Sequence, residues 1–144
     1  MPEQRKKNLR ELVQQVTGHA SSRSEQVEIV SLLCRSSQEA CRGSVFFAET
    51  KAHIYAQEAL EKGATAVVVD EPIAGIREEQ QILVPDVRLA LSRAAHWFYD
   101  APSHELEVFG FTGTNGKTTT TWIANQLLGA LGKQTVTIGT LGAF

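Results

Sequence analysis

A glycine-rich segment at residues 110–118 constrains the fold of this chain more than any other feature. It lies between an apolar stretch with β character at residues 106–109 and a helical pattern at residues 119–131. A strand, a glycine-rich loop and a helix in this order can hold phosphate, because glycines let backbone N–H groups turn inward and the helix start carries partial positive charge. The sequence therefore predicts an α/β architecture with a phosphate-binding loop.

Within this loop, Lys117 is expected to reach the terminal phosphates of a nucleotide, and the hydroxyl of Thr118 is expected to ligate Mg²⁺. The usual pattern has glycine where Phe111 stands, so a plain turn between strand and helix is the alternative. If the loop binds phosphate, further backbone donors are expected from Gly113, Thr114, Asn115, Gly116 and Thr119.

The string Thr-Gly-Thr-Asn-Gly-Lys-Thr at residues 112–118 resembles the ATP-binding loop of the Mur ligases. The likeness is strongest to the branch that adds the third residue of the peptidoglycan stem peptide. It implies a small N-terminal UDP-binding α/β domain, followed by the opening strand, phosphate loop, helix and strand of an ATP-binding domain. Other strings similar to this family stand at residues 43–48, 63–69, 98–103 and 138–142.

The resemblance also implies an activity. ATP would phosphorylate the D-Glu carboxylate of UDP-N-acetylmuramoyl-L-alanyl-D-glutamate, with Mg²⁺, and the amine of lysine or diaminopimelate would attack the acyl phosphate. The family's metal-binding glutamate, modified lysine and amino-acid pocket lie beyond residue 144. We therefore expect the 144-residue chain to be inactive alone, and the added amino acid cannot be read from it.

Two other functions stay open. One is a sister ligase, such as the enzyme that adds D-Ala-D-Ala, or a folyl- or cyanophycin-type ligase. The other is a non-catalytic, truncated module that only binds a nucleotide or a partner. Residues 138–142, Ile-Gly-Thr-Leu-Gly, favour the tripeptide-forming branch.

The N-terminal region would hold the UDP part of the substrate. Many relatives carry Asp-Ser-Arg seven residues ahead of the 43–48 string, and only the central Ser37 is retained here. The resemblance implies that its hydroxyl hydrogen-bonds uracil or diphosphate, whereas the alternative is a surface serine in a turn. Relatives also carry a glycine-containing loop that residues 49–54 lack; Lys51 or His53 could replace its contacts, or this loop is simply solvated.

A linker expected at residues 101–104 divides the chain into two parts, residues 1–104 and 105–144. In the first part we expect a helix with Leu9, Leu12, Val13 and Val16 on one face, and another capped by Asp86 that continues to Tyr99. Strands are expected at residues 27–33, 45–48, 66–69 and 81–84, with a further helix at 56–62. The second part would contribute strands at 106–109 and 135–138, too few to complete a parallel sheet.

Composition excludes several classes of protein. With 21% charged residues and a net charge of −2, the chain has no electrostatic footprint for nucleic acid. The basic start is followed by polar residues rather than an apolar core, and no apolar run approaches the roughly 18 residues of a membrane span. We expect a cytoplasmic monomer, with Cys34 and Cys41 as reduced thiols rather than metal ligands.

Overall fold

A computed structural model describes residues 5–19, 28–140 and 142–143 of the chain. The chain divides into two compact units, residues 1–105 (unit 1) and residues 106–144 (unit 2). Among the described residues, no helix is long and apolar enough to cross a membrane.

Unit 1 is built on a four-stranded parallel sheet in the order β3-β4-β5-β6. The strands are β3 (Leu32–Cys34), β4 (Ser44–Ala48), β5 (Ala66–Val69) and β6 (Gln81–Leu83). Every residue of β4 and β5 is buried, as expected for β-branched and aromatic strands covered on both faces. The predicted strands at 45–48, 66–69 and 81–84 are confirmed to within one residue.

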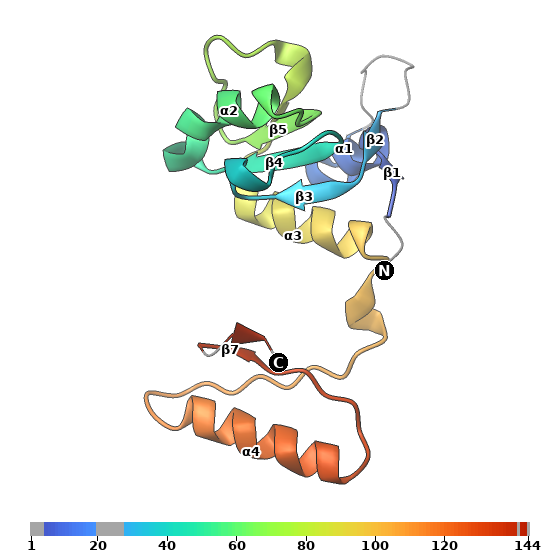
Figure 1. Cartoon of the computed structure of the whole chain (residues 1–144), viewed down its shortest axis with the longest axis vertical. Coiled ribbons are helices and arrows are strands. Elements are labelled where there is room, and N and C mark those ends of the chain that lie inside the picture. The colour runs from blue at the N-terminus through green and yellow to red at the C-terminus, as the bar shows by residue number, and fades with distance from the viewer. Residues whose placement is uncertain (1–4, 20–27, 141, 144) are drawn as a thin grey trace. The chain divides into compact units, whose positions relative to one another are not determined.

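Helices cover both faces of this sheet, giving three layers (Figure 1). On one face, α1 (Leu9–Thr17) and α3 (Val87–Phe98) pack over alternate sheet residues such as Phe47 and Val68. On the other face, α2 (Ala56–Glu61) packs over their strand neighbours Phe46 and Val67. The predicted apolar face of α1 is confirmed, because its members are all buried: Leu9, Leu12, Val13 and Val16.

The strand expected at residues 27–33 is divided between two sheets. Residue 27 lies outside the described residues; β2 (Ile29–Val30) pairs antiparallel with the short strand β1 (Lys7–Asn8), while β3 joins the main sheet. Between them, the Ser31 N–H donates to Gly43 O at 2.8 Å. A Cβ at Gly43, where φ is +85°, would come within 2.7 Å of Ser31 Oγ. The close approach of Gly43 to Ser31 therefore requires glycine.

Short 3₁₀ helices form several connections of unit 1. They are η1 (Ser37–Glu39), η2 (Thr50–Tyr55), η3 (Glu78–Gln80) and η4 (Pro102–His104), the last within the expected linker. The preceding residues Asp100 and Ala101 have positive φ values of 61° and 55°. Lys7 Nζ donates to Asp100 Oδ1 at 2.5 Å, which ties this turn back to β1.

The start of α3 depends on the cap that the sequence predicts. Asp86 has an extended backbone, and its Oδ1 accepts a hydrogen bond from the Leu89 N–H at 2.9 Å. We expect Asp86→Ala to lower the free energy of unfolding of unit 1 by about 1 kcal/mol, because one helix-start donor loses its partner. Urea denaturation measures the change. Asp86→Asn is the matched control and should stay close to wild type, since asparagine caps equally well.

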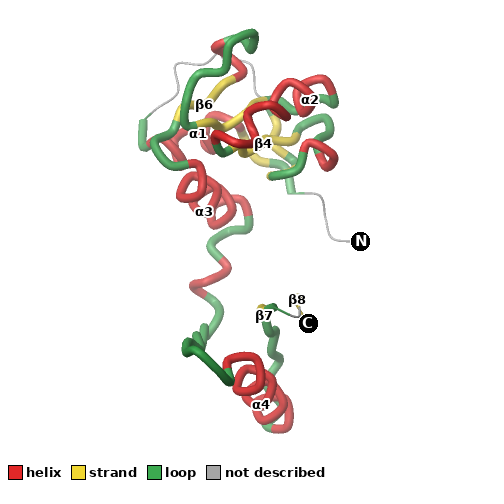
Figure 2. Tube along the Cα trace, turned by 90° about the vertical axis from the view of Figure 1, so that its left-hand side faces the viewer, coloured by secondary structure: helices red, strands yellow, loops and turns green. Residues whose placement is uncertain are grey.

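Unit 2 contains α4 (Lys117–Ala130) and a short antiparallel pair, β7 (Ile138–Gly139) with β8 (Gly142–Ala143). The expectation of strands at 106–109 and 135–138 is wrong here: residues 106–109 form no strand, and only Ile138 of the second stretch does. Figure 2 shows loop on both sides of α4. A parallel strand needs a hydrogen-bonded neighbour, and no described residue pairs with 106–109.

Candidate phosphate-binding site

The glycine-rich loop leads directly into the first turn of α4. Gly116 is the N-cap residue with φ of 79°, and no side chain caps the helix start. Gly113 also has a positive φ, 150°. Both values favour glycine, and the uncapped start leaves the first N–H groups of a 14-residue helix available to an anion.

Lys117 folds back over its own loop. Its Nζ donates to Gly113 O at 2.5 Å and contacts Thr114 O at 3.4 Å. It forms no ion pair with any residue that the structure describes. The ammonium is therefore held against neutral carbonyl oxygens, and a phosphate would be a stronger acceptor for it.

Thr118 lies at the second position of α4, where its hydroxyl oxygen is 3.4 Å from Thr140 Oγ1. Thr121 donates instead to Lys117 O at 2.8 Å, within the helix. Residues 110–144 contain two lysines and no acidic residue. This stretch therefore suits an anion. The hydroxyl of Thr118 offers a hard oxygen ligand next to the loop, but residues 110–144 supply no carboxylate ligand for a cation.

Ser37, the predicted UDP contact, lies in unit 1 just beyond the carboxyl end of β3, as the first residue of η1. It is only 7% exposed. Its Oγ donates to Glu58 Oε2 at 2.8 Å, and Glu58 Oε1 accepts from Lys62 Nζ at 2.6 Å. The expected alternative of an exposed turn serine does not describe this residue, because its hydroxyl is buried against α2.

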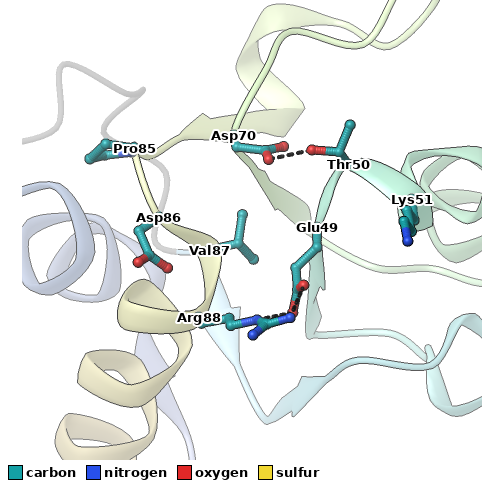
Figure 3. Close-up of a pocket in the computed structure, with 8 residues that line it drawn as sticks. All are labelled: Glu49, Thr50, Lys51, Asp70, Pro85, Asp86, Val87 and Arg88. Carbon is teal, nitrogen blue, oxygen red and sulfur yellow. Dashed lines mark hydrogen bonds and ion pairs between the residues drawn. The ribbon is translucent and has the colours of Figure 1, made fainter.

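A pocket of about 470 Å³ lies at the carboxyl edge of the sheet (Figure 3), where open α/β sheets bind ligands. Arg88 Nε and Nη2 donate to the two carboxylate oxygens of Glu49 at 3.0 and 2.9 Å. This bidentate pair lowers the pKa of Glu49. The lining residues are Glu49, Thr50, Lys51, Asp70, Pro85, Asp86, Val87 and Arg88.

The two other residues suggested as diphosphate contacts differ in their surroundings. His53 Nε2 lies 2.8 Å from Asp70 Oδ1, a close contact without the alignment of a hydrogen bond. The hydrogen bond from Thr50 to Asp70 Oδ2, at 2.6 Å, lowers the pKa of Asp70 and keeps it ionised beside His53. Lys51 lines the pocket and forms no ion pair with a described residue, so its side chain is the freer of the two.

Cys34 and Cys41 are free thiols, the first buried and the second exposed. Burial raises the pKa of Cys34, which makes its thiol less reactive. No group of three or more potential metal ligands occurs among the residues with described positions.

Sequence reasoning missed Glu58 and Arg88, the partners of Ser37 and Glu49. The spacing of Glu58 and Lys62 does indicate an ion pair on α2. No local pattern links Ser37 to Glu58, 21 residues later, or Glu49 to Arg88, 39 residues later.

Known proteins are similar to this chain in sequence and in fold. A UDP-N-acetylmuramoyl-L-alanyl-D-glutamate–2,6-diaminopimelate ligase of Aquifex aeolicus is 43% identical over 110 residues, which cover 74% of this chain. Over the matched residues, this chain belongs to the Mur ligase family. It spans 22% of the length of that relative. No protein-family model matches the chain.

Solved Mur ligases share its fold. A crystal structure of MurF from Acinetobacter baumannii superposes with a TM-score of 0.66 at 26% identity, covering 92% of this chain and 29% of that one. MurF ligase from Thermotoga maritima, solved in complex with ADP, gives a TM-score of 0.53 at 26% identity, covering 68% of this chain and 23% of that one. The expected α/β class of a Mur ligase is therefore confirmed.

Proposed function

We propose that this chain supplies the UDP-binding part and the first ATP-binding segment of an ATP-dependent ligase of peptidoglycan synthesis. The observation that carries the proposal is the position of Lys117 and Thr118 at the uncapped start of α4, directly after the glycine-rich loop. The substrates would be UDP-N-acetylmuramoyl-L-alanyl-D-glutamate and an amino acid. The name of the Aquifex aeolicus relative favours 2,6-diaminopimelate over lysine.

In this function unit 2 holds ATP. Lys117 contacts the terminal phosphates, and backbone N–H groups of the loop and of Thr119 surround them. The oxygen of Thr118 would be one ligand of Mg²⁺, which neutralises phosphate charge when bound. The remaining backbone donors would come from Gly113, Thr114, Asn115, Gly116 and Lys117.

The reaction would transfer the γ-phosphoryl group of ATP to a carboxylate oxygen, giving ADP and an acyl phosphate. The amine of the amino acid would then displace phosphate and form the amide. Phosphoryl transfer needs positioning and charge stabilisation more than covalent chemistry from the protein. The contribution of this chain is therefore to hold the phosphates and the UDP part of the substrate.

A sister ligase is the second candidate, because solved MurF structures match the fold at 26% identity. The higher identity to the diaminopimelate ligase, 43%, favours the tripeptide-forming enzyme.

A hybrid enzyme tests the proposal. In the hybrid, this chain replaces the segment of the Aquifex aeolicus ligase that it matches. We expect ADP release that depends on the muramoyl dipeptide and diaminopimelate, and a loss of more than about 100-fold in Lys117→Ala of the same hybrid.

Two results would contradict the proposal. One is turnover by the 144-residue chain alone in a contaminant-free sample, since we expect it to be inactive. The other is a hybrid with the circular dichroism and size of the parent enzyme that releases no ADP. Replacing diaminopimelate by D-Ala-D-Ala in the assay separates the two candidate ligases.

A further inference from the structure

The turn that follows α3 is formed by two non-glycine residues in the left-handed region, Asp100 and Ala101, with φ values of 61° and 55°. The Asp100 N–H donates to Trp97 O at 3.2 Å, and the Ala101 N–H donates to His96 O at 2.7 Å. This pair of bonds closes the end of a helix and usually has glycine at the first left-handed position, because a Cβ is unfavourable there. Other contacts of the fold must therefore hold the turn in this conformation.

Two cations from the start of the chain supply such contacts. Lys7 Nζ donates to Asp100 Oδ1 and to Trp97 O, both at 2.5 Å. Arg5 Nη1 donates to the other carboxylate oxygen, Asp100 Oδ2. These hydrogen bonds, the one from Lys7 above all, lower the pKa of Asp100 and keep its carboxylate ionised at neutral pH. The carbonyl that closes the turn is thus shared by the Asp100 N–H and the Lys7 ammonium.

The same cations contact aromatic rings near the end of α3. Lys7 Nζ lies 4.8 Å from the ring centroid of Trp97, and the guanidinium carbon of Arg5 lies 5.8 Å from that of Tyr99. The side chain of Lys7 is only 21% exposed, so its charge is screened less than that of a fully exposed lysine. An isolated surface ion pair contributes little, whereas a network of ion pairs with defined geometry contributes more.

The N-terminal segment is itself anchored in unit 1. Lys7 belongs to β1 and pairs with Val30 of β2, and the Leu9 N–H donates to Glu28 O at 2.9 Å. Lys6, between the two cations, is exposed and forms no ion pair with a described residue. The contacts to the turn therefore come from alternate residues of a fixed segment.

We propose that Arg5 and Lys7 form a clamp that holds the turn at residues 100–101 in its left-handed conformation. Through this clamp the N-terminal segment controls the connection that leads from α3 to unit 2. When the ion pairs are broken, the two turn residues can leave the left-handed region, and the connection is released from the end of α3. The clamp needs no ligand, and all of its residues lie in unit 1, so it does not depend on the proposed function.

Hydrogen exchange of backbone amides in the full chain, followed by NMR, tests the clamp. In Lys7→Met, which keeps the apolar stem and loses the charge, we expect protection of the Asp100 and Ala101 amides to fall about tenfold. The amide of Val68, in the central strand β5, should keep its protection. Lys6→Met is the matched control and should leave all three amides unchanged.

A second substitution asks whether the clamp acts on the left-handed backbone. Glycine adopts this region without a steric penalty, so in an Ala101→Gly background the turn should need the clamp less. There, Lys7→Met should lower protection at positions 100 and 101 by less than about threefold. An ion pair that only adds surface charge attraction would give the same factor in both backgrounds.

Salt provides a measurement that needs no substitution. In about 1 M NaCl the partly exposed ion pairs are screened, so wild-type protection at positions 100 and 101 should fall toward that of Lys7→Met, which should respond little. The inference is overturned if Lys7→Met or salt leaves these two amides protected, or if the loss of protection is the same with and without Ala101→Gly. It is also overturned if Val68 loses protection to the same extent, since Lys7 would then stabilise unit 1 as a whole and not the turn.

Discussion

Replacing Phe46 by alanine is expected to lower the free energy of unfolding of unit 1 by about 3–5 kcal/mol. Phe46 is in the middle of β4, 1% exposed, and packs in the cluster between the sheet and α2. Removing a fully buried ring loses its transfer free energy and leaves a cavity between strands that pair on both sides. Urea denaturation in a Trp122→Phe background measures this, because Trp97 then reports on unit 1.

The matched control is the same substitution at an exposed position, Phe109→Ala in unit 2. Phe109 is 66% exposed, and its removal should change the stability of unit 1 by less than about 0.5 kcal/mol. Equal stabilities for wild type and Phe46→Ala would mean that the sheet does not pack against α2 as described.

Lys117→Ala is expected to weaken the binding of ATP with Mg²⁺ by about 2–3 kcal/mol, a factor of roughly 30 to 150. In the wild-type structure, Lys117 Nζ contacts only carbonyl oxygens of the loop. The substitution therefore removes a charged donor without breaking an ion pair among the described residues. Titration calorimetry on the full chain measures the affinity. Binding by the wild type is itself expected to be weak, since unit 2 buries few of its apolar side chains.

Lys133→Ala provides the control for charge, because this lysine belongs to the same unit but follows the far end of α4. It should leave ATP affinity within about twofold, given that surface charges at a distance contribute little. UDP affinity should be the same in all three proteins. If Lys117→Ala and Lys133→Ala behave alike, the loop does not bind phosphate through Lys117.

The sequence was sufficient for elements whose pattern is local. The spacing of Leu9, Leu12, Val13 and Val16 predicts a helix with one buried face, and α1 has that face. The run of four apolar residues at 66–69 predicts a strand buried on both sides, and β5 has the same bounds. These patterns succeed because a helix or a buried strand is specified by residues that are neighbours in the sequence.

Prediction from the sequence was wrong for strands that depend on pairing with another segment of the chain. Leu106, Val108 and Phe109 have the composition of a strand, but they are more than 60% exposed and pair with no described residue. Strand formation requires hydrogen bonds to a neighbouring chain segment, which β propensity alone does not provide. For the same reason the strand expected at 27–33 is divided between two sheets.

The loop from Gly113 to Thr119 and the N-cap at Asp86 follow from residue type and order, because glycine conformation and capping are properties of adjacent residues. The hydrogen bond from Ser37 to Glu58 and the bidentate pair of Glu49 with Arg88 follow only from the folded chain. These contacts join side chains 21 and 39 residues apart, and the packing of helices on the parallel sheet is what brings them within hydrogen-bond distance.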